Sequence, residues 1–262
     1  MAAPSPQTPR RWRRRLRIAG ELATLAVTIP LLFVWCSIPD PSPLAHENPT
    51  TTAFVELRRS EAAAAGKKLE LRMTWRPLGR ISRYLRDAVV LSEDWSFYSH
   101  DGVDWGAIEH AFETDLASGL KIGGSTITQQ LAKNLYFSPS RSVIRKVREM
   151  LVAFRLEKHL SKQRILELYL NVVEWGDGVF GAEAAARRWF GVSAAALTPA
   201  QAARLAIALP NPRTRAPNVH SAELAKKAVR IVRLFRVQGV IDADQEREAL
   251  SDLGVETALP PP

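Results

Sequence analysis

Hydrophobic residues recur at helical spacing over most of the chain. Ile81, Leu85 and Val89 share one side of one helix, and a second apolar stripe runs through 144–154. Alternation of apolar and polar residues, which is typical of strands, is confined to one short stretch, 69–75. The sequence contains no internal repeat and no regular exchange of strands with helices. The pattern therefore predicts a mainly α fold.

Turn-forming and capping residues divide this pattern into separate helices. Asp104 and Ser161 are suited to cap helices, and Thr198-Pro199-Ala200-Gln201 is a capping box with proline at the first helical position. Glycines at 176, 178 and 181 indicate a loop. The expected helices cover about 54–65, 81–94, 105–117, 128–136, 144–154, 161–170, 199–209, 221–238 and a last one from 242.

The N-terminal part of the chain has the composition of a membrane anchor. Residues 18–38 are almost all apolar, and a helix of these 21 residues is about 30 Å long, the thickness of one hydrocarbon core. Six arginines lie in 1–17, so the positive-inside rule places this basic tail in the cytoplasm and the rest outside. Phe33-Val34-Trp35 is a poor cleavage site, which disfavours a removed signal peptide. The proline-rich 39–49 is predicted to be a stiff spacer before a folded domain at 50–262.

Charge and cysteine content exclude two classes of site. The chain of 262 residues has a net charge of +9, and six of these charges come from the tail arginines, so the rest carries only +3. This balance argues against a nucleic-acid-binding surface across the fold. Cys36 is the only cysteine, so neither an intramolecular disulfide nor a cysteine-based metal site exists.

The segment Gly123-Gly124-Ser125-Thr126-Ile127-Thr128-Gln129-Gln130 has the composition of a turn that leads into a helix. Paired glycines permit the turn, and Ser125 or Thr126 can cap the helix that follows. Free N–H groups, hydroxyls and the nearby Lys133 suit an oxygen-rich anion. A glycine turn with a capping hydroxyl and no ligand is the plainer alternative. A P-loop is excluded because no Gly-Lys-Ser/Thr follows.

Basic residues gather shortly after this turn. Lys133, Arg141, Arg145 and Lys146 lie within 14 positions, a composition that fits phosphate or pyrophosphate. Arg145 and Lys146 are also four and three residues before Glu149, so an intrahelical ion pair is the simpler explanation of that trio. Among such bases, Glu149 could instead hold a divalent cation that bridges to phosphate oxygens.

Three motifs stand together in this order. They are Glu93-Asp94 with Phe97, His100 and Gly102, then Gly-Gly-Ser-Thr-Ile-Thr-Gln-Gln-Leu-x-Lys-Asn at 123–134, then Arg145-Lys146-x-x-Glu149 with Ile-Leu-Glu-x-Tyr-Leu-Asn at 165–171. This set resembles the peptidoglycan glycosyltransferases, family 51 of the glycosyltransferases. Segments 171–191 and 206–213 also match, so the resemblance covers about residues 50–235. The Asn-Val-Val-Glu-Trp-Gly segment at 171–176 and the single anchor are similar to the monofunctional biosynthetic form, and no transpeptidase domain is expected before the chain ends at Pro262.

The resemblance implies a lysozyme-like, two-lobed α fold with an N-terminal transmembrane helix. It implies that lipid II, a disaccharide-pentapeptide on undecaprenyl pyrophosphate, is polymerised into glycan strands. Each step would form a β-1,4 linkage with inversion and release undecaprenyl pyrophosphate. The enzyme would be a single-pass protein of the bacterial inner (cytoplasmic) membrane with its catalytic domain on the periplasmic, extracytoplasmic side. Expected partners are lipid II, the lipid-linked strand and the membrane. Cell-division or elongation proteins stay open as partners, and no nucleic acid is expected.

The resemblance also assigns roles to individual residues. Glu93 matches the family's general base. Glu149 matches the second acidic position, which helps to position acceptor pyrophosphate or a divalent cation, Mg²⁺ or Mn²⁺. Apart from the resemblance, His100 could act as an acid, but a structural role in holding the loop that presents Glu93 and Asp94 is preferred. The expected binding residues are Lys133 and Arg141 for the donor phosphate, Arg145 and Lys146 beside Glu149, and Ser125, Thr126 and Gln130 along the cleft.

Two other functions compete with this one. A lysozyme-like lytic glycosidase would share an α fold and a catalytic Glu93, but it would have no need for the basic group after the turn. A catalytically silent, membrane-anchored division scaffold would need neither Glu93 nor Glu149.

Overall fold

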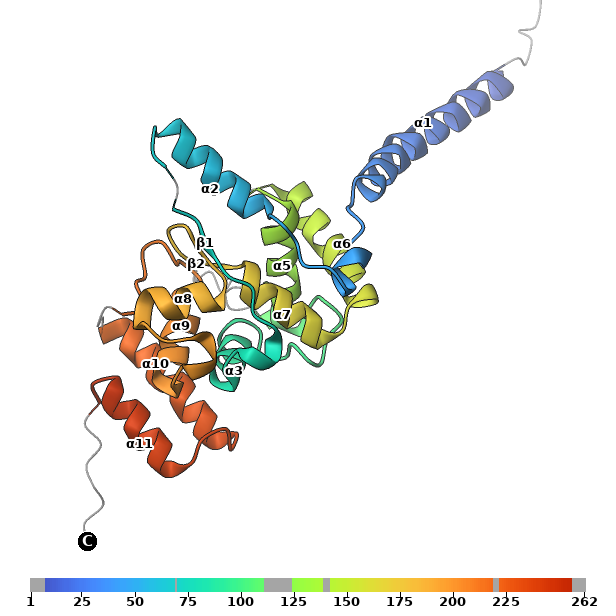
Figure 1. Ribbon diagram of the computed structural model, residues 1–262. Helices are drawn as coiled ribbons and strands as arrows, with labels where there is room; N and C mark the ends of the chain where they lie inside the picture. The colour runs from blue at the N-terminus through green and yellow to red at the C-terminus, as the bar shows by residue number, and fades with distance from the viewer. Residues whose placement is uncertain (1–7, 69, 111–123, 139–141, 219–221, 256–262) are drawn as a thin grey trace, which may run out of the picture. The chain divides into compact units, whose positions relative to one another are not determined.

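The structure is a computed structural model that describes residues 8–68, 70–110, 124–138, 142–218 and 222–255 (Figure 1). The chain divides into two units, Met1–Pro39 and Asp40–Pro262, and each is described by itself. Residues 105–110 are helical, as predicted, and the rest of the helix expected at 105–117 lies outside the described residues.

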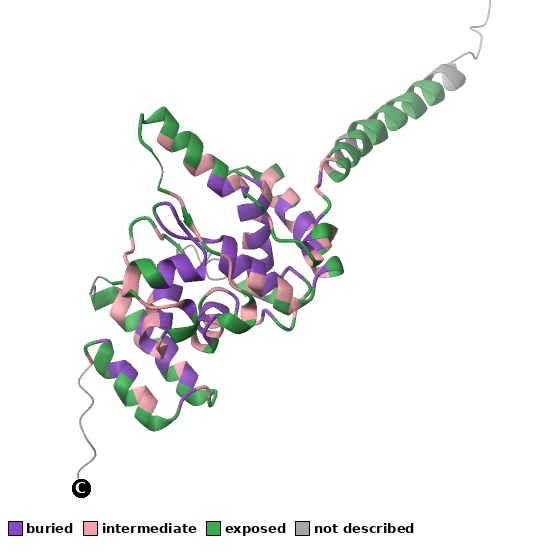
Figure 2. Ribbon diagram, viewed as in Figure 1, coloured by how far each residue is buried: buried purple, intermediate pink, exposed green. Residues whose placement is uncertain are grey.

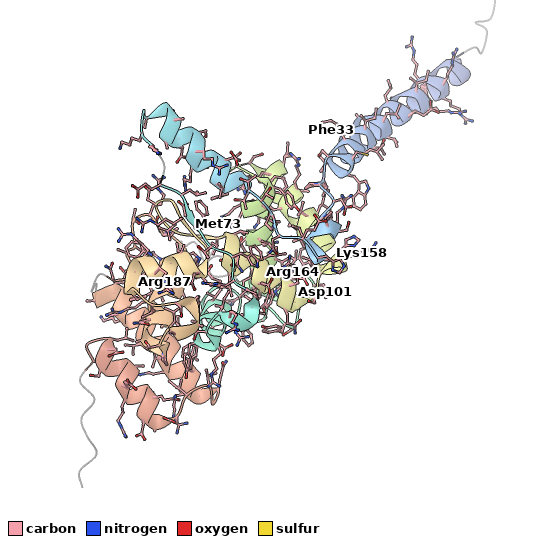
Figure 3. The ribbon with its side chains drawn as sticks, in the orientation of Figure 1. Phe33, Met73, Asp101, Lys158, Arg164 and Arg187 are labelled. Carbon is pink, nitrogen blue, oxygen red and sulfur yellow. The ribbon has the colours of Figure 1, made fainter. Side chains whose placement is uncertain are left out.

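The first unit is built on one helix, α1 (Thr8–Cys36), which includes both the arginines and the apolar segment. Most of its described apolar side chains are exposed, and Phe33, labelled in Figure 3, is 73% exposed. Within the described ranges, no helix combines the length and the apolar character needed to cross a membrane. The membrane-spanning helix predicted at 18–38 is therefore not confirmed.

The second unit is mainly helical, as the sequence predicts. Its described elements are η1 (Ser42–Ala45), α2 (Ala53–Ala64), β1 (Arg72–Met73), η2 (Leu78–Arg80), α3 (Arg83–Glu93), α5 (Ile127–Tyr136), α6 (Val143–His159), α7 (Lys162–Val172), β2 (Glu174–Gly176), β3 (Val179–Phe180), α8 (Ala182–Phe190), η3 (Ala194–Ala196), α9 (Pro199–Ala208), α10 (Ala222–Val237) and α11 (Ala243–Asp252).

The helices of this unit pack in two groups. In one group, α5 packs against α2, α6 and α7, and in the other, α9 packs against α3, α10 and α11. Figure 1 shows the green and yellow helices of the first group beside the orange and red helices of the second. Buried residues run along the inner sides of both groups (Figure 2). The C-terminal end of α3 belongs to the second group, and the N-terminal end of α5 belongs to the first.

A three-stranded sheet in the order β1-β3-β2 lies next to these helices. β1 is parallel to β3, with Arg72 opposite Val179, so the extended stretch predicted at 69–75 is confirmed in its centre. Met73, labelled in Figure 3, packs against a buried cluster of Phe54, Val55 and Phe180. The start of α2 is therefore packed against the sheet.

Helix α8 was missed by the sequence pattern. The glycines on its N-terminal side indicated a loop, and its run of alanines carries little periodicity. Gly181 adopts a φ of +83°, and a Cβ there would lie 2.7 Å from the carbonyl oxygen of Asn171. A side chain at 181 would thus push α7 and α8 apart, which explains why a glycine precedes this helix.

The apolar side predicted for the helix at 144–154 is not its buried side. Ile144 is 65% exposed and Val147 is 44% exposed. The buried face of α6 carries Glu149, Val152 and Leu156. The reason is that α6 has apolar residues on two sides, and its contact with α5 decides which side is covered.

Candidate active site

The turn before α5 is closed by Thr126 and not by Ser125. The Thr126 hydroxyl accepts a hydrogen bond from the Gln129 N–H at 3.2 Å, and Gln129 Oε1 accepts one from the Thr126 N–H at 3.2 Å. The same hydroxyl donates to the Gly102 carbonyl oxygen at 2.6 Å. This capping box uses the Thr126 side chain to hold the fold together, and it leaves the neighbouring Ser125 hydroxyl for other contacts.

Asp94 ties the loop after α3 to the start of α5. Its carboxylate accepts from the Ile127 N–H at 2.9 Å, which satisfies one of the free N–H groups of the helix. It also lies 2.9 Å from Nε2 of His100. His100 Nδ1 accepts from the Gly102 N–H at 3.1 Å, which leaves Nε2 to donate to the Asp94 carboxylate. These contacts agree with the structural role expected for His100, which stays a prediction.

Glu93 is the last residue of α3 and lies beside Gln130. Gln130 Nε2 donates to Glu93 Oε2 at 2.8 Å, and the Tyr169 hydroxyl donates to Gln130 Oε1 at 2.9 Å. Burial raises the pKa of Glu93, while the Gln130 hydrogen bond and the charges of Lys133 and Arg215 pull this pKa back. A carboxylate with such a raised pKa is suited to take a proton from a weak acid near neutral pH.

Lys146 links the turn to Glu149. Its ammonium donates to the Ser125 hydroxyl at 2.7 Å and to Gln129 Oε1 at 3.3 Å, and it lies 3.8 Å from Glu149 Oε2. Arg145 forms an ion pair with the other oxygen of Glu149. Glu149 is only 2% exposed. Arg145, Lys146 and Glu149, for which the sequence allowed either an ion pair or a ligand site, thus form an ion-paired cluster directly beside the turn.

Lys133 lies on α5 over the ring of Phe54, with its ammonium nitrogen 5.5 Å from the ring centre. Burial lowers the pKa of Lys133, and the positive charge of Arg145 adds to this effect, while Glu149 and Glu93 oppose it. Burial likewise lowers the pKa of Lys146. Both lysines would gain from an anion between them, because a negative charge would offset their loss of hydration.

The structure thus brings together most of the predicted site. Arg141 lies outside the described residues. Hydrogen bonds and ion pairs connect Ser125, Thr126, Arg145, Lys146 and Glu149, with Gln129 as the shared partner of Thr126 and Lys146. Gln130 and Glu93 form a separate hydrogen-bonded pair, and the charges of both Glu93 and Glu149 act on the pKa of Lys133.

Two cavities meet at Glu93, and Leu91, Ser92 and Glu93 line both of them. The first, of about 190 Å³, extends over the turn and is lined also by Asp94, Trp95, Ser96, Asp104, Ala107, Gly124, Ser125 and Thr126. The second, of about 320 Å³, is lined also by Ala206, Ile207, Pro210, Arg215, Lys227, Arg230, Ile231 and Leu234. Glu93 therefore lies at the border between the two cavities.

Glu149 is the site residue expected to bind a metal ion, and few potential ligands surround it among the described residues. No group of three or more potential metal-ligating side chains occurs in these parts of the chain. Glu149 is the carboxylate nearest the basic residues, and both its oxygens face cations, Arg145 and Lys146. A divalent cation would have to share Glu149 with oxygens from a substrate.

Several functional side chains escaped the sequence reasoning. Tyr169 belongs to the Ile-Leu-Glu-x-Tyr-Leu-Asn motif, but only the fold places its hydroxyl against Gln130. Gln129 contacts the Lys146 ammonium, and the positive charge of Arg215, in the segment after α9, lowers the pKa of Glu93. A polar residue within an otherwise apolar helix face was the available signal for Tyr169, and no signal was available for Arg215.

Comparisons with known proteins show which family this chain is similar to. Residues 61–236 match the family described as transglycosylase. A biosynthetic peptidoglycan transglycosylase of Aromatoleum aromaticum is 48% identical over 207 residues, covering 76% of this chain and 86% of that protein. Proteins with the same name from Janthinobacterium sp. (48% identical, 72% of this chain and 82% of that protein) and Azoarcus sp. (53%, 63% and 72%) are also similar.

Proposed function

Because the chain belongs to the transglycosylase family, we propose that it polymerises lipid II into the glycan strands of peptidoglycan. The relatives' name, biosynthetic peptidoglycan transglycosylase, supports this class of reaction. The observation that carries the proposal is the position of Glu93. Its carboxylate lies where two cavities meet, and it is fixed by Gln130.

The chemistry follows from the groups around that carboxylate. The 4-hydroxyl of the incoming lipid II attacks the anomeric carbon of the growing strand, and its proton passes to Glu93. The new C–O bond forms as the bond to the pyrophosphate oxygen breaks, so undecaprenyl pyrophosphate leaves with the electron pair. One displacement inverts the anomeric carbon from α to β. The leaving group is already anionic, so it needs cations more than it needs a proton.

Basic side chains on α5 and α6 would supply those cations. Lys146 contacts the Ser125 hydroxyl, Arg145 pairs with Glu149, and the charge of Glu149 also acts on the pKa of Lys133. On the sequence alone, we propose that Arg141 also binds the pyrophosphate. Glu149 holds Arg145 and Lys146 in place, and we infer that a divalent cation, Mg²⁺ or Mn²⁺, binds Glu149 only together with pyrophosphate oxygens.

A lysozyme-like two-lobed architecture is part of the proposal. Its support is the packing of α5 with α6 and α7 in one group and of α9 with α3 and α10 in the other. Glu93 and the turn at Ser125 come from different groups. A glycosidase would place a second free carboxylate near the first. Asp94 is already bonded to His100 and the Ile127 N–H, which favours synthesis over hydrolysis.

Attachment to the inner membrane, with the domain outside the cytoplasm, is likewise proposed. The apolar composition of 18–38 and the arginines before it support an anchor there. A second support is the exposed apolar side of α6, which includes Val143, Ile144 and Val147. Such a surface suits an enzyme whose substrate keeps its lipid tail in the bilayer.

Incubation of the full chain with labelled lipid II and Mg²⁺ in detergent tests the proposal. The expected product is a polymer, seen on a gel, that a muramidase digests. Glu93→Gln should abolish the polymer while lipid II binding persists, and the matched control Glu248→Gln, exposed on α11, should polymerise normally. Strand cleavage without synthesis would establish the lytic alternative. Folded protein that binds lipid II and makes no polymer would favour the scaffold.

A further inference from the structure

The larger of the two cavities is lined by apolar and basic side chains that proton transfer at Glu93 does not require. Its floor is apolar and comes from the end of α3, the end of α9 and one side of α10, which the structure packs against one another. Its volume of about 320 Å³ lies at the lower end of the range for small-ligand sites, roughly 300–1,000 Å³. Leu91, Ile207 and Ile231 are among the floor residues.

Three cations lie along the same cavity. Arg215, Lys227 and Arg230 line it, and Glu93 is the only acidic side chain among the lining residues. The Lys227 ammonium lies 2.9 Å from Glu223, but both side chains are at least half exposed, so this pair is weak. The cavity wall therefore has an excess of positive charge.

Lipid II, as the proposed substrate, has two anionic parts. One is the pyrophosphate, for which Lys133, Arg145 and Lys146 on α5 and α6 provide the cations. The other is the pentapeptide, which ends in a carboxylate. None of the three pyrophosphate-binding candidates lines the larger cavity. A second basic group on the other side of Glu93 thus fits the second anion.

We propose that this cavity binds the carboxylate-bearing peptide carried by the sugar at Glu93, with Lys227 and Arg230 holding the carboxylate. Amino-acid side chains of the peptide lie on the apolar floor. The inference rests on the proposed function, because it takes lipid II as the substrate. Substrate binding then depends on whether the peptide is present with its carboxylate, although the bond that is formed joins only two sugars.

A pair of substrates tests the peptide directly. Lys227→Gln with Arg230→Gln should raise the KM for pentapeptide-bearing lipid II about fivefold at unchanged kcat, since partly exposed ion pairs contribute modestly. With lipid II from which the peptide has been removed, the double variant and the unchanged protein should have the same KM. Arg215 is left unchanged because it acts on the charge of Glu93.

Matched controls come from the same helix. Lys226→Gln with Arg233→Gln removes the same charge from exposed positions of α10 that do not line the cavity, and its KM should stay unchanged. The proposal is overturned if the Lys227/Arg230 variant handles pentapeptide lipid II normally. It is also overturned if the KM of the variant rises equally for both substrates, which would indicate the glycan or the pyrophosphate as the ligand.

A binding measurement separates this proposal from the polymerase proposal. The soluble disaccharide-pentapeptide, without lipid or pyrophosphate, is titrated into the full chain in detergent. Binding should persist in Glu93→Gln and weaken about fivefold in the Lys227/Arg230 variant. If the protein makes no polymer but shows this pattern, the cavity assignment stands and the polymerase proposal fails. If the protein polymerises but shows no such binding, the cavity assignment fails.

Discussion

The hydroxyl of Tyr169 donates to Oε1 of Gln130 at 2.9 Å, and this bond decides which way the Gln130 amide points. With Oε1 held by Tyr169, the NH₂ group faces Glu93 and donates to it at 2.8 Å. Tyr169 is fully buried and burial raises its pKa well above the usual value, so its hydroxyl keeps the proton that it donates to Gln130. A residue of α7 thereby positions the candidate base on α3.

Tyr169→Phe should lower kcat about tenfold with little change in KM. The variant frees Gln130 to rotate and leaves its buried Oε1 without a donor, which costs about 1 kcal/mol of stability. Steady-state kinetics and a pH profile test this, because a change in the hydrogen bond to Glu93 moves the acidic limb of the profile. Tyr98→Phe, exposed in the same unit, is the control. An unchanged kcat and an unchanged pH profile would show that Tyr169 serves packing alone.

The activity should depend on pH through Glu93. Burial raises the pKa of this carboxyl, and the group accepts a proton only when it is ionised. The acidic limb of kcat/KM should therefore lie at higher pH than the ordinary glutamate range, and activity should fall as pH drops through it. A profile that stays flat down to the ordinary range would contradict the assignment.

The same shift has an opposite consequence for stability. A carboxyl with a raised pKa in the folded state destabilises the fold as pH rises through that pKa, because the folded state must then hold a buried charge. Glu93→Gln should accordingly have a higher Tm than the unchanged protein at neutral pH, and the difference should vanish in acid. Thermal melts at several pH values measure this. Equal melting temperatures at neutral pH would argue against burial as the cause of the shift.

Lys133→Ala should raise the KM for lipid II about ten- to hundredfold, because a charge-assisted hydrogen bond to the pyrophosphate is lost. Lys158→Ala is the matched control, since Lys158 is exposed at the end of α6 (Figure 3). Inorganic pyrophosphate should inhibit the unchanged protein better than the Lys133→Ala variant. Wild-type inhibition and kinetics in that variant would remove Lys133 from the anion site.

Trp95 lines the smaller cavity and is 78% exposed, so its ring is free to lie against a sugar. Trp95→Ala should raise KM about fivefold without lowering Tm, since stacking on an exposed ring contributes about 1 kcal/mol. Trp105→Ala, at a tryptophan that is 62% exposed and lines neither cavity, should change nothing. Equal effects of the two substitutions would indicate a general surface effect.

Much of the site was predictable because its chemistry is local in the sequence. The turn at Ser125 and Thr126 is followed at once by the helix that it caps, and Lys146 and Glu149 are neighbours on one helical turn. Glu93 was predictable from its motif as the acid that ends α3. Helix positions were also largely correct, since periodicity and capping act over a few residues.

The tertiary structure alone decided which of these groups meet. Tyr169 and Glu93 are distant in sequence, and only the packing of α5 against α7 brings Gln130 between them. Tertiary packing alone also places Arg215 near Glu93 and decides which face of α6 is buried. The local sequence determines where a helix begins and ends and on which side of the helix each residue lies. Which side is buried depends on the neighbouring element that covers it, and the position of that neighbour is set by the whole chain.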